Sequence, residues 1–532
     1  MPPAESSSGS PTTATAPPPD HSLPVDGRGT ASSGSAPAPA SAPGSSAPGG
    51  GDLELGWDYA PAPESLSVAI EPKYGLFIDG AFRAPKSRKH FTSVNPATEE
   101  PLAEIADAGP KDVEAAVAAA RAAFPKWSRV KPVERAKFLF RIARRIQERA
   151  RELAVLETMD GGKPIRESRD TDVPLVAAHF FHHAGWCDKL AYAFPGRTPR
   201  PHGVCAQIIP WNFPLLMMAW KLAPALACGN TVVIKPAETT SLTALRLAEI
   251  LQECELPPGV VNVVTGGPKT GELLVGSPGI DKIAFTGSTE VGKRIAAEAA
   301  PRGIPLTLEL GGKSPNLIFA DAPVDQAIEG IVKGIWFNQG QVCCAGSRVI
   351  VEESILQDVV RRLEHRLGTL RVGDPLDKNT DVGAINSPQQ LETIRRYVGI
   401  GRKEGATLHE VNGSRLPRKG FWCRPAFFTG VQPSHVIARE EIFGPVLAVM
   451  SFRTPEEAIA RANDTPYGLS AGVWTDKGSK IFAIASRLKA GVVWCNTYNT
   501  FDPTAPFGGY RESGFGREGG LAGLRAYVRL DG

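Results

Sequence analysis

The sequence has no long hydrophobic run and no excess of charge of either sign. No apolar stretch reaches the roughly 18 residues that a membrane-spanning helix needs, so we expect no membrane partner. Lys and Arg total 59 against 56 for Asp and Glu, which leaves a net charge of +3. This balance does not favour a nucleic-acid partner, because proteins that bind nucleic acid usually carry a strongly basic surface.

Paired-cysteine motifs are also absent. The eight cysteines include no CxxC, and no secretory signal precedes them, so we predict reduced thiols in a cytoplasmic protein. His179, His182 and His183 lie with Cys187 at helical spacings, which is one pattern for zinc binding. No complementary ligand cluster accompanies them, so we predict no metal site.

Large apolar residues are scarce in residues 1–65, which are mostly Pro, Ser, Ala and Gly. Such a segment cannot bury enough surface to offset the entropy that ordering would cost. We predict a disordered tail over residues 1–65, either a dispensable extension or a tether, with ordered structure from about Tyr74.

The remaining chain is too long for one ordinary core and alternates short apolar runs with helical patterns. Two helices are expected first, at residues 112–124 and from Pro132 to about Met159. Strands are then expected at residues 204–209, 231–235, 260–264, 282–285 and 306–310, with helices at 215–227 and 241–254. A second series has strands at 316–319, 348–351, 446–452, 472–475 and 491–494, with a helix at 324–337. This alternation predicts two α/β units with parallel sheets and ligands at the carboxyl ends of strands.

Two familiar phosphate motifs fail on inspection. Gly514-Phe-Gly516-Arg-Glu-Gly519 matches GxGxxG, but it follows no expected strand and too little chain remains for a βαβ unit. Gly312-Lys313-Ser314 resembles the end of a P-loop, but Thr307 occupies the position of the required first glycine. We therefore reject both as phosphate sites of those kinds.

Cys343 becomes a candidate functional residue when it is considered together with three other segments. Alone it reads as a small buried hydrophobe, and a bridge to the adjacent Cys344 would be strained, because neighbouring Cα atoms are only about 3.8 Å apart. Glu309 lies in the apolar run Leu-Thr-Leu-Glu, where a carboxylate is costly unless it has a task. Asn212 follows an expected strand, and residues 286–292 mark a strand-to-helix junction that can hold a pyrophosphate.

These segments together resemble the aldehyde dehydrogenase superfamily from about Leu76 to Leu524. The resemblance rests on PWNFP, KPAE, FTGSTEVG, LELGGKSP, FNQGQVCCAGSR, EEIFGPV and PFGGYRESG in the family's order. The Gln-Val-Cys-Cys version and Ala184-Gly185-Trp186 are most similar to the family 16 branch. The resemblance implies an α/β fold with a Rossmann-type NAD-binding domain at residues 66–189 and 204–311. It also implies an α/β catalytic domain at 312–512 and a β oligomerisation arm at 190–203 and 513–532.

The resemblance also assigns the chemistry. Cys343 would be the nucleophile that forms a thiohemiacetal and then a thioester with an aldehyde. The Asn212 amide and the Cys343 main-chain N–H would stabilise the oxyanion. Glu309 would be the general base that activates water to hydrolyse the thioester. A carboxylate at this position favours a free acid, because branches that make acyl-coenzyme A generally lack it.

The implied cofactor is NAD, with NADP as the alternative. Lys235 and Glu238 would contact the adenosine ribose, where Glu238 would repel a 2′-phosphate, and Ser288 would contact the pyrophosphate. Glu441 and Phe443 would position the nicotinamide ribose, which Gln390 would also reach. The full expected cofactor site is Ile208, Pro210, Trp211, Lys235, Glu238, Gly287, Ser288, Gly292, Leu310, Gln390, Glu441 and Phe443.

The implied substrate tunnel is large and apolar, which suits a hydrophobic aldehyde, although aromatic residues near a domain junction are also common core residues. Its expected residues are Phe213, Met217, Trp220, Phe337, Phe501 and Phe507.

Two further expectations concern assembly and rival functions. The stretch from Trp186 to Val204 is shorter than in the family, and the chain stops at Gly532 soon after Tyr527. We therefore predict a homodimer or an altered homo-oligomer instead of the common tetramer. Two alternatives remain, a non-catalytic scaffold subunit that keeps the fold and a cysteine hydrolase in which Cys343 pairs with a histidine.

Overall fold

The computed structural model describes residues 60–410 and 416–531, so residues 1–59 of the predicted tail lie outside the described residues. The last residues of that predicted tail are hydrogen-bonded to another segment. The Ala62 N–H donates to Asp377 Oδ1 at 3.1 Å, and the Glu64 N–H donates to the Leu376 carbonyl at 2.8 Å. Residues 60–65 therefore do not share the disorder predicted for them, because partners distant in sequence bind their backbone.

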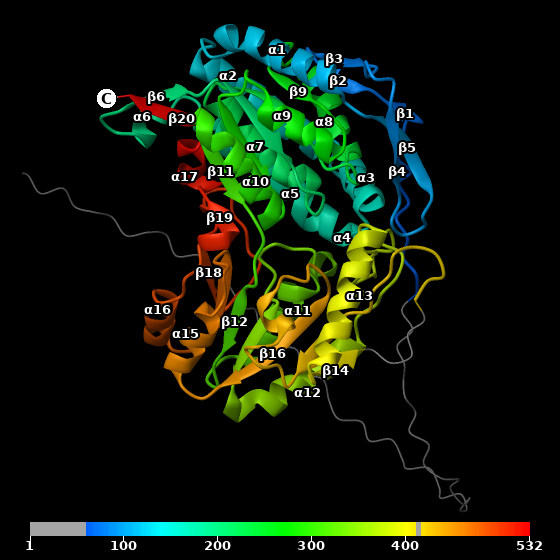
Figure 1. The fold of residues 1–532 in the computed structure, drawn as a ribbon, viewed down its shortest axis with the longest axis vertical. Coiled ribbons are helices and arrows are strands. Elements are labelled where there is room, and N and C mark those ends of the chain that lie inside the picture. The colour runs from blue at the N-terminus through cyan, green and yellow to red at the C-terminus, as the bar shows by residue number, and fades with distance from the viewer. Residues whose placement is uncertain (1–59, 411–415, 532) are drawn as a thin grey trace, which may run out of the picture. The chain divides into compact units, whose positions relative to one another are not determined.

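An eight-stranded sheet forms the first half of the molecule, in the order β19-β11-β10-β7-β8-β9-β2-β3 (Figure 1). Its strands are β2 (Leu76–Ile78), β3 (Ala81–Arg83), β7 (Val204–Ile208), β8 (Thr231–Lys235), β9 (Val261–Val263), β10 (Lys282–Thr286), β11 (Leu306–Glu309) and β19 (Gly514–Phe515). The five central strands are parallel, and each was expected from its apolar run. The chain order reverses between β7 and β10, which is where ligands bind in open α/β sheets.

Helices pack against this sheet and supply much of its core. The helices with the main strand contacts are α1 (Pro110–Trp127), α7 (Pro214–Ala227), α8 (Leu242–Glu253), α9 (Pro268–Gly276) and α10 (Thr289–Ala299). Further helices pack mainly on one another and on α7 and α8: α2 (Pro132–Glu148), α3 (Ala150–Gly161), α4 (Ile165–Glu167), the π-helix η1 (Ser168–Asp172) and α5 (Val173–Ala184). Every residue of α7 is buried, because this helix packs against the sheet, α2, α5 and α8.

The single helix predicted from Pro132 to Met159 is wrong in one respect. The structure divides it into α2 and α3 at Arg149, whose φ of −101° and ψ of 16° are not helical. The Arg149 guanidinium bonds to Glu152 and Glu253 at 2.8 Å each. The apolar pattern continues through the break, so hydrophobic spacing alone does not reveal it.

A seven-stranded sheet forms the second half, in the order β14-β15-β16-β13-β12-β17-β18 (Figure 1). Its strands are β12 (Pro315–Ile318), β13 (Arg348–Glu352), β14 (Thr407–Glu410), β15 (Ala426–Thr429), β16 (Val446–Phe452), β17 (Ser470–Trp474) and β18 (Val492–Cys495). The accompanying helices include α11 (Val324–Ile335), the 3₁₀ turn η3 (Phe337–Gly340), α12 (Leu356–Gly368), α13 (Pro388–Lys403), α15 (Pro455–Asn463) and α16 (Gly478–Ala485). All strand pairs except β14 with β15 are parallel.

The two sheets meet end to end. The chain leaves the carboxyl end of β11 at Glu309 and enters the amino end of β12 at Pro315 after five residues. The carboxyl ends of the first sheet therefore lie close to the amino ends of the second sheet. Loops from both sets of strand ends can contribute side chains to one site.

Two smaller sheets contain the remaining strands of the described chain, and two short helices, α14 (Val436–Arg439) and α17 (Gly520–Arg525), lie outside the sheets. The strands β1 (Lys73–Tyr74), β4 (His90–Val94) and β5 (Pro101–Ala106) form one, and β6 (Thr198–Pro201) pairs antiparallel with β20 (Val528–Asp531) to form the other. The latter joins the two segments that were predicted as an arm. Residue 513 is too early a start for that arm, because Gly514–Phe515 is strand β19 of the eight-stranded sheet.

Candidate active site

A cavity of about 880 Å³ lies where the strand ends of the two sheets meet, and it collects almost every residue singled out in the sequence. Its lining includes the three expected catalytic residues, all six expected tunnel residues and every expected cofactor residue except Gly292. Gly292 lies on α10 against the cavity wall instead. A Cβ there would come within 2.5 Å of Leu310 Cδ2, so the glycine allows Leu310 its place in the lining.

Cys343 and Cys344 lie in different surroundings although they are adjacent. Both residues line the cavity, and Cys343 is the half-buried one. Cys344 is buried, and its thiol donates to Asn499 Oδ1 at 3.6 Å. A hydrogen bond with Cys343 and burial both hold the pKa of the Cys344 thiol above its usual range. Since the thiolate is the nucleophile, the arrangement favours Cys343 over its neighbour.

The Asn212 side chain is tied to the loop that carries Cys343. Asn212 follows β7, and its Nδ2 donates to the Gln341 carbonyl at 2.9 Å. A carboxamide has two N–H groups, so one remains for a ligand beside Cys343. Asn212 and Cys343 line the same cavity, so this N–H is available to an acceptor bound there.

Glu309 is the last residue of β11. Its side chain is buried, and neither carboxylate oxygen has a hydrogen-bond partner within the described residues. Burial and the nearby Glu518 carboxylate hold the pKa of Glu309 well above its usual range. Gly508 makes room for it, because a Cβ there would lie 2.6 Å from Glu309 Oε1.

Lys221 and Glu518 belong to this site and were missed by sequence reasoning. Lys221 is fully buried on α7, forms an ion pair with Glu518 and donates to Thr286 Oγ1 at 2.6 Å. Glu518 lines the cavity and contributes to the raised pKa of Glu309, whereas Lys221 opposes that rise. The available signal was a lysine inside the otherwise apolar run of α7.

The part of the cavity near β8 and β10 has the features of a nucleotide site. Lys235 ends β8, and its ammonium lies 3.5 Å from Glu238 Oε2. Burial lowers the pKa of Lys235. Ser288 is the N-cap of α10, where its hydroxyl accepts from the Val291 N–H at 3.3 Å. A helix N-terminus that opens into a cavity favours a bound phosphate.

Another part of the cavity wall contains the carboxylate of Glu441. Glu441 Oε1 accepts from the Gly312 N–H at 3.1 Å, and burial raises the pKa of Glu441 to about 7. Gln390 donates to the carbonyls of Ile442 and Phe443 at 3.1 and 2.9 Å, so its amide holds the turn next to Glu441. Trp211 packs edge-on against Phe443, with ring centroids 5.2 Å apart.

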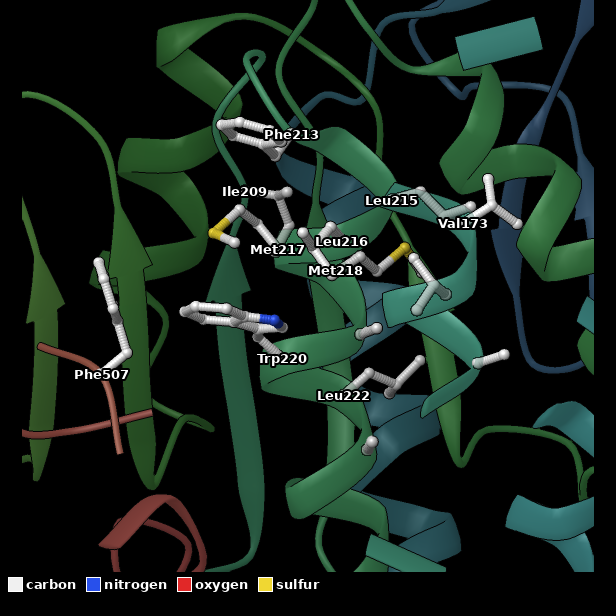
Figure 2. Close-up of a cluster of buried hydrophobic side chains, with 14 of the residues drawn as sticks. Val173, Ile209, Phe213, Leu215, Leu216, Met217, Met218, Trp220, Leu222 and Phe507 are labelled. Atoms are coloured by element: carbon white, nitrogen blue, oxygen red, sulfur yellow. The ribbon is translucent and has the colours of Figure 1, made fainter. Parts of the chain in front are cut away.

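Aromatic and apolar side chains form the remaining wall. Figure 2 shows Phe213, Met217 and Trp220 along one side of α7, with Phe507 opposite them. The Trp220 ring lies 5.2 Å from Phe507 and 6.1 Å from Phe501, and Phe213 stacks with Phe337 at 6.1 Å. All six expected tunnel residues line the cavity, so they are not core alone.

The three histidines noted in the sequence lie on α5 behind that wall. His179 is buried with its ring 5.2 Å from Trp220, and burial lowers its pKa well below the usual range. No group of three His, Cys, Asp or Glu side chains suited to a metal occurs within residues 60–410 and 416–531. In the same residues, no helix combines the length and apolar character needed to cross a membrane.

Comparison with known proteins identifies the family. The model of the aldehyde dehydrogenase family matches residues 82–531. The putative aldehyde dehydrogenase DhaS of Bacillus subtilis is 45% identical over 478 residues, which cover 87% of this chain and 96% of that protein. Human retinal dehydrogenase 2 is 45% identical over 87% of this chain and 92% of its own length.

Solved structures agree with the sequence comparison. An NAD⁺ complex of an aldehyde dehydrogenase from Bacillus cereus superimposes with a TM-score of 0.85 at 42% identity, covering 88% of this chain and 98% of that one. The assignment to the family 16 branch stays a prediction. The matched length, the identity and the shared fold together show that the chain belongs to the aldehyde dehydrogenase family.

Proposed function

We propose that this enzyme oxidises an aldehyde to a carboxylic acid through a covalent adduct on Cys343, with NAD as the hydride acceptor. The observation that carries the proposal is the shared cavity. It brings a half-buried thiol, a carboxamide N–H and a buried carboxylate with no hydrogen-bond partner in the described part of the chain to one place, beside a helix N-terminus and an apolar wall. Each group has a distinct task in the reaction.

The acylation half begins when the Cys343 thiolate attacks the aldehyde carbon. A carbon–sulfur bond forms, and the carbonyl oxygen becomes an oxyanion that accepts from Asn212 Nδ2 and from the Cys343 main-chain N–H. Loss of hydride from the same carbon leaves a thioester, and bound NAD supplies the acceptor. Removing one oxyanion donor typically costs about a hundredfold or more in rate.

The deacylation half needs a base. Ionised Glu309 takes a proton from water, which attacks the thioester and releases the acid and the Cys343 thiolate. Since its pKa is raised, Glu309 is ionised in a growing fraction of molecules as the pH rises. Lys221 opposes that rise, so we assign to it and to Glu518 the task of tuning this carboxylate.

The residues around the cavity fit a nicotinamide dinucleotide. The pair of Lys235 and Glu238 suits ribose hydroxyls, the Ser288 end of α10 suits the pyrophosphate, and Glu441 suits a second ribose. Gly311 supports this fit, because a Cβ there would lie 2.0 Å from Glu441 Oε2 and displace it. A carboxylate at Glu238 disfavours a 2′-phosphate, so NAD is favoured over NADP. The NAD⁺ complex of the Bacillus cereus relative supports the same choice.

Domain limits, assembly and location complete the proposal. We assign residues 66–189 and 204–311 to cofactor binding, 312–512 to catalysis, and the paired β6 and β20 strands to an oligomerisation arm. Because only the four residues of α6 (Leu190–Ala193) and the four of β6 lie between Cys187 and Val204 as helix or strand, the arm is small. A homodimer therefore fits better than a tetramer.

The eight free cysteines support a cytoplasmic location.

The test is a screen of aliphatic, aromatic and semialdehyde substrates with NAD or NADP, followed by NADH absorbance and product analysis. The proposal expects a free acid in equal amount to the NADH formed, and a higher kcat/KM with NAD. Ester cleavage without any NAD reduction would favour a cysteine hydrolase. An enzyme that binds NAD and oxidises none of the aldehydes would favour a scaffold.

A further inference from the structure

Lys163 is a buried cation next to the main chain of Asn212. Its side chain is 2% exposed and forms an ion pair with Asp172, which is fully buried at the end of η1. The Lys163 ammonium also donates to the Asn212 carbonyl at 3.3 Å and lies 4.0 Å from the centroid of the Phe213 ring. Burying a charged pair is costly and often adds no stability, so its placement against a catalytic segment calls for another explanation.

Asn338 donates to the same carbonyl from a different segment. Its Nδ2 lies 2.8 Å from the Asn212 oxygen and 3.2 Å from the Gln341 oxygen. Its main-chain N–H donates to Glu167 Oε2 at 2.8 Å, and its φ of 47° is in the left-handed region. Asn338 is thus held in a strained conformation in which its amide joins the Asn212 peptide to the loop before Cys343.

Both lone pairs of the Asn212 carbonyl are therefore used by buried side chains. The Asn212 side chain is fixed as well, through its bond to the Gln341 carbonyl. If the peptide rotated, the free amide N–H would move relative to Cys343. An oxyanion donor acts by being oriented before the reaction begins, so what fixes its peptide also fixes its effect on rate.

We propose that Lys163 and Asn338 are positioning residues that hold the Asn212 main-chain carbonyl and thereby aim its amide at the oxyanion formed on Cys343. The inference rests on the proposed role of Asn212. Asp172 is the buried ion-pair partner of Lys163. Neither Lys163 nor Asn338 lines the cavity, whereas Asp172 does, so Asn338→Gly is the variant that reaches Asn212 without altering the cavity wall.

The test uses variants that remove each donor without leaving an unpaired charge or adding backbone strain. Lys163→Met with Asp172→Asn removes the ion pair together, and Asn338→Gly removes the amide while tolerating the left-handed φ. Each is made alone and with Asn212→Ala. Arg135→Met is the matched control, because Arg135 is a buried cation on α2 that donates to the carbonyls of Ala227 and Val130 and does not line the cavity.

Four readouts separate positioning from general damage. They are kcat for NAD reduction, hydrolysis of 4-nitrophenyl acetate, alkylation of Cys343 by iodoacetamide, and NAD affinity by fluorescence. Aldehyde oxidation and ester cleavage both form an oxyanion, whereas alkylation does not. Positioning therefore predicts that kcat and ester hydrolysis fall by about tenfold to a hundredfold, since small misplacements cost that much. Alkylation and NAD affinity should stay within about threefold, as should all four readouts in the control.

Non-additivity decides the mechanism. Where Asn212→Ala has already removed the donor, the Lys163/Asp172 and Asn338 changes should cost less than about twofold more. The inference is overturned if the Lys163/Asp172 and Asn338 variants leave kcat unchanged. It is also overturned if they lower kcat by the same factor in the Asn212→Ala background as in the original chain, or if Cys343 alkylation falls in parallel with kcat. If the double variant does not fold, Asn338→Gly alone decides. If Asn212→Ala itself keeps full activity, the oxyanion role in the proposed function fails first.

Discussion

Two adjacent thiols at the centre of the site differ by burial and by partner. Both residues line the cavity, but Cys343 is half-buried, whereas Cys344 is buried and its thiol donates to Asn499 Oδ1. The chemistry at this position is therefore decided by which side chain the loop turns outward. That loop includes left-handed residues at Asn338 and Gln339, with φ of 47° and 54°, so its turn is specified by the backbone as well as by packing.

This difference predicts opposite outcomes for two alanine substitutions. Cys343→Ala should lower NAD reduction with every aldehyde by at least about a thousandfold, because the nucleophile is lost. Cys344→Ala should keep activity within about tenfold and cost about 1 kcal/mol of stability, since it removes one buried sulfur. Steady-state kinetics and thermal unfolding check both. Loss of activity in Cys344→Ala alone would reverse the assignment.

At the scale of elements, the short crossover from β11 to β12 begins directly after Glu309 and carries two glycines, Gly311 and Gly312. Both glycines contact Glu441, which belongs to a distant segment of the chain. Gly311 lies against Glu441 with no space for a Cβ, and the Gly312 N–H binds the same carboxylate. The crossover therefore positions both Glu309, the proposed general base, and one end of the proposed cofactor site.

Gly311→Ala should weaken NAD binding by about tenfold, because the added methyl group displaces Glu441 and one carboxylate contact is worth about 1.4 kcal/mol or more. Isothermal titration with NAD measures the change. Gly478→Ala is the control, since a Cβ on that α16 glycine would meet no atom within 4 Å. Equal NAD affinity in the two variants would show that Gly311 does not set the position of Glu441.

Buried carboxylates on α3 and α4 make the stability of this region depend on pH. Burial raises the pKa of Glu157 and that of Glu167 from the ordinary 4.5 of a glutamate to about 8 each. Between pH 4.5 and pH 8, these two carboxyl groups keep their protons in the folded chain and have lost them in the unfolded chain. The free energy of unfolding should therefore fall by about 1.4 kcal/mol per pH unit for each group as the pH rises from 4.5 to 8.

Glu157→Gln removes one of these groups, so its unfolding free energy should fall less steeply over the same range. Urea unfolding at pH 5, 6, 7 and 8 gives the free energy of unfolding at each pH, and so its slope against pH, in the variant and in the original chain. Identical slopes would mean that Glu157 is ionised in the folded protein throughout this range.

Sequence patterns predicted most elements of the parallel sheets because a strand buried on both faces is a short apolar run between turn signals. The central strands from Val204 to Glu309 and the core of the second sheet followed from that signal. The break at Arg149 and the pairing of residues 60–65 did not, because both depend on partners distant in the chain.

Most residues of the candidate site, like most strands of the sheets, were predicted from the sequence. Cys343, Glu309, Asn212 and nearly all the cofactor residues came from motif resemblance, and they line one cavity. Lys221, Glu518, Lys163 and Asn338 were missed, because their role lies in contacts between segments far apart, such as the Lys221–Glu518 pair. A buried lysine in an apolar helix signals such a contact, but it does not name the partner.

At the scale of the whole molecule, the assembly depends on the small arm formed by β6 and β20. Its two strands pair antiparallel, and Arg200 lies 2.6 Å from Asp531 across them. A two-stranded sheet offers little surface for a second interface, since stable interfaces bury about 1,200 Å² or more.

We therefore expect a homodimer. Light scattering coupled to size exclusion, at several protein concentrations, should give the mass of two chains throughout. A mass of four chains that persists on dilution would show that the small arm suffices for a tetramer.

The central claim is a covalent acyl adduct on Cys343 that Glu309 helps to hydrolyse. Its most direct test is Glu309→Gln mixed with an aldehyde substrate and NAD, stopped with acid within seconds and analysed by peptide mass spectrometry. We predict a rapid burst of NADH, slow turnover afterwards, and the mass of the acyl group on Cys343 in the peptide that contains both cysteines. An acyl group on Cys344, or steady NADH formation with no adduct on either thiol, would contradict the account.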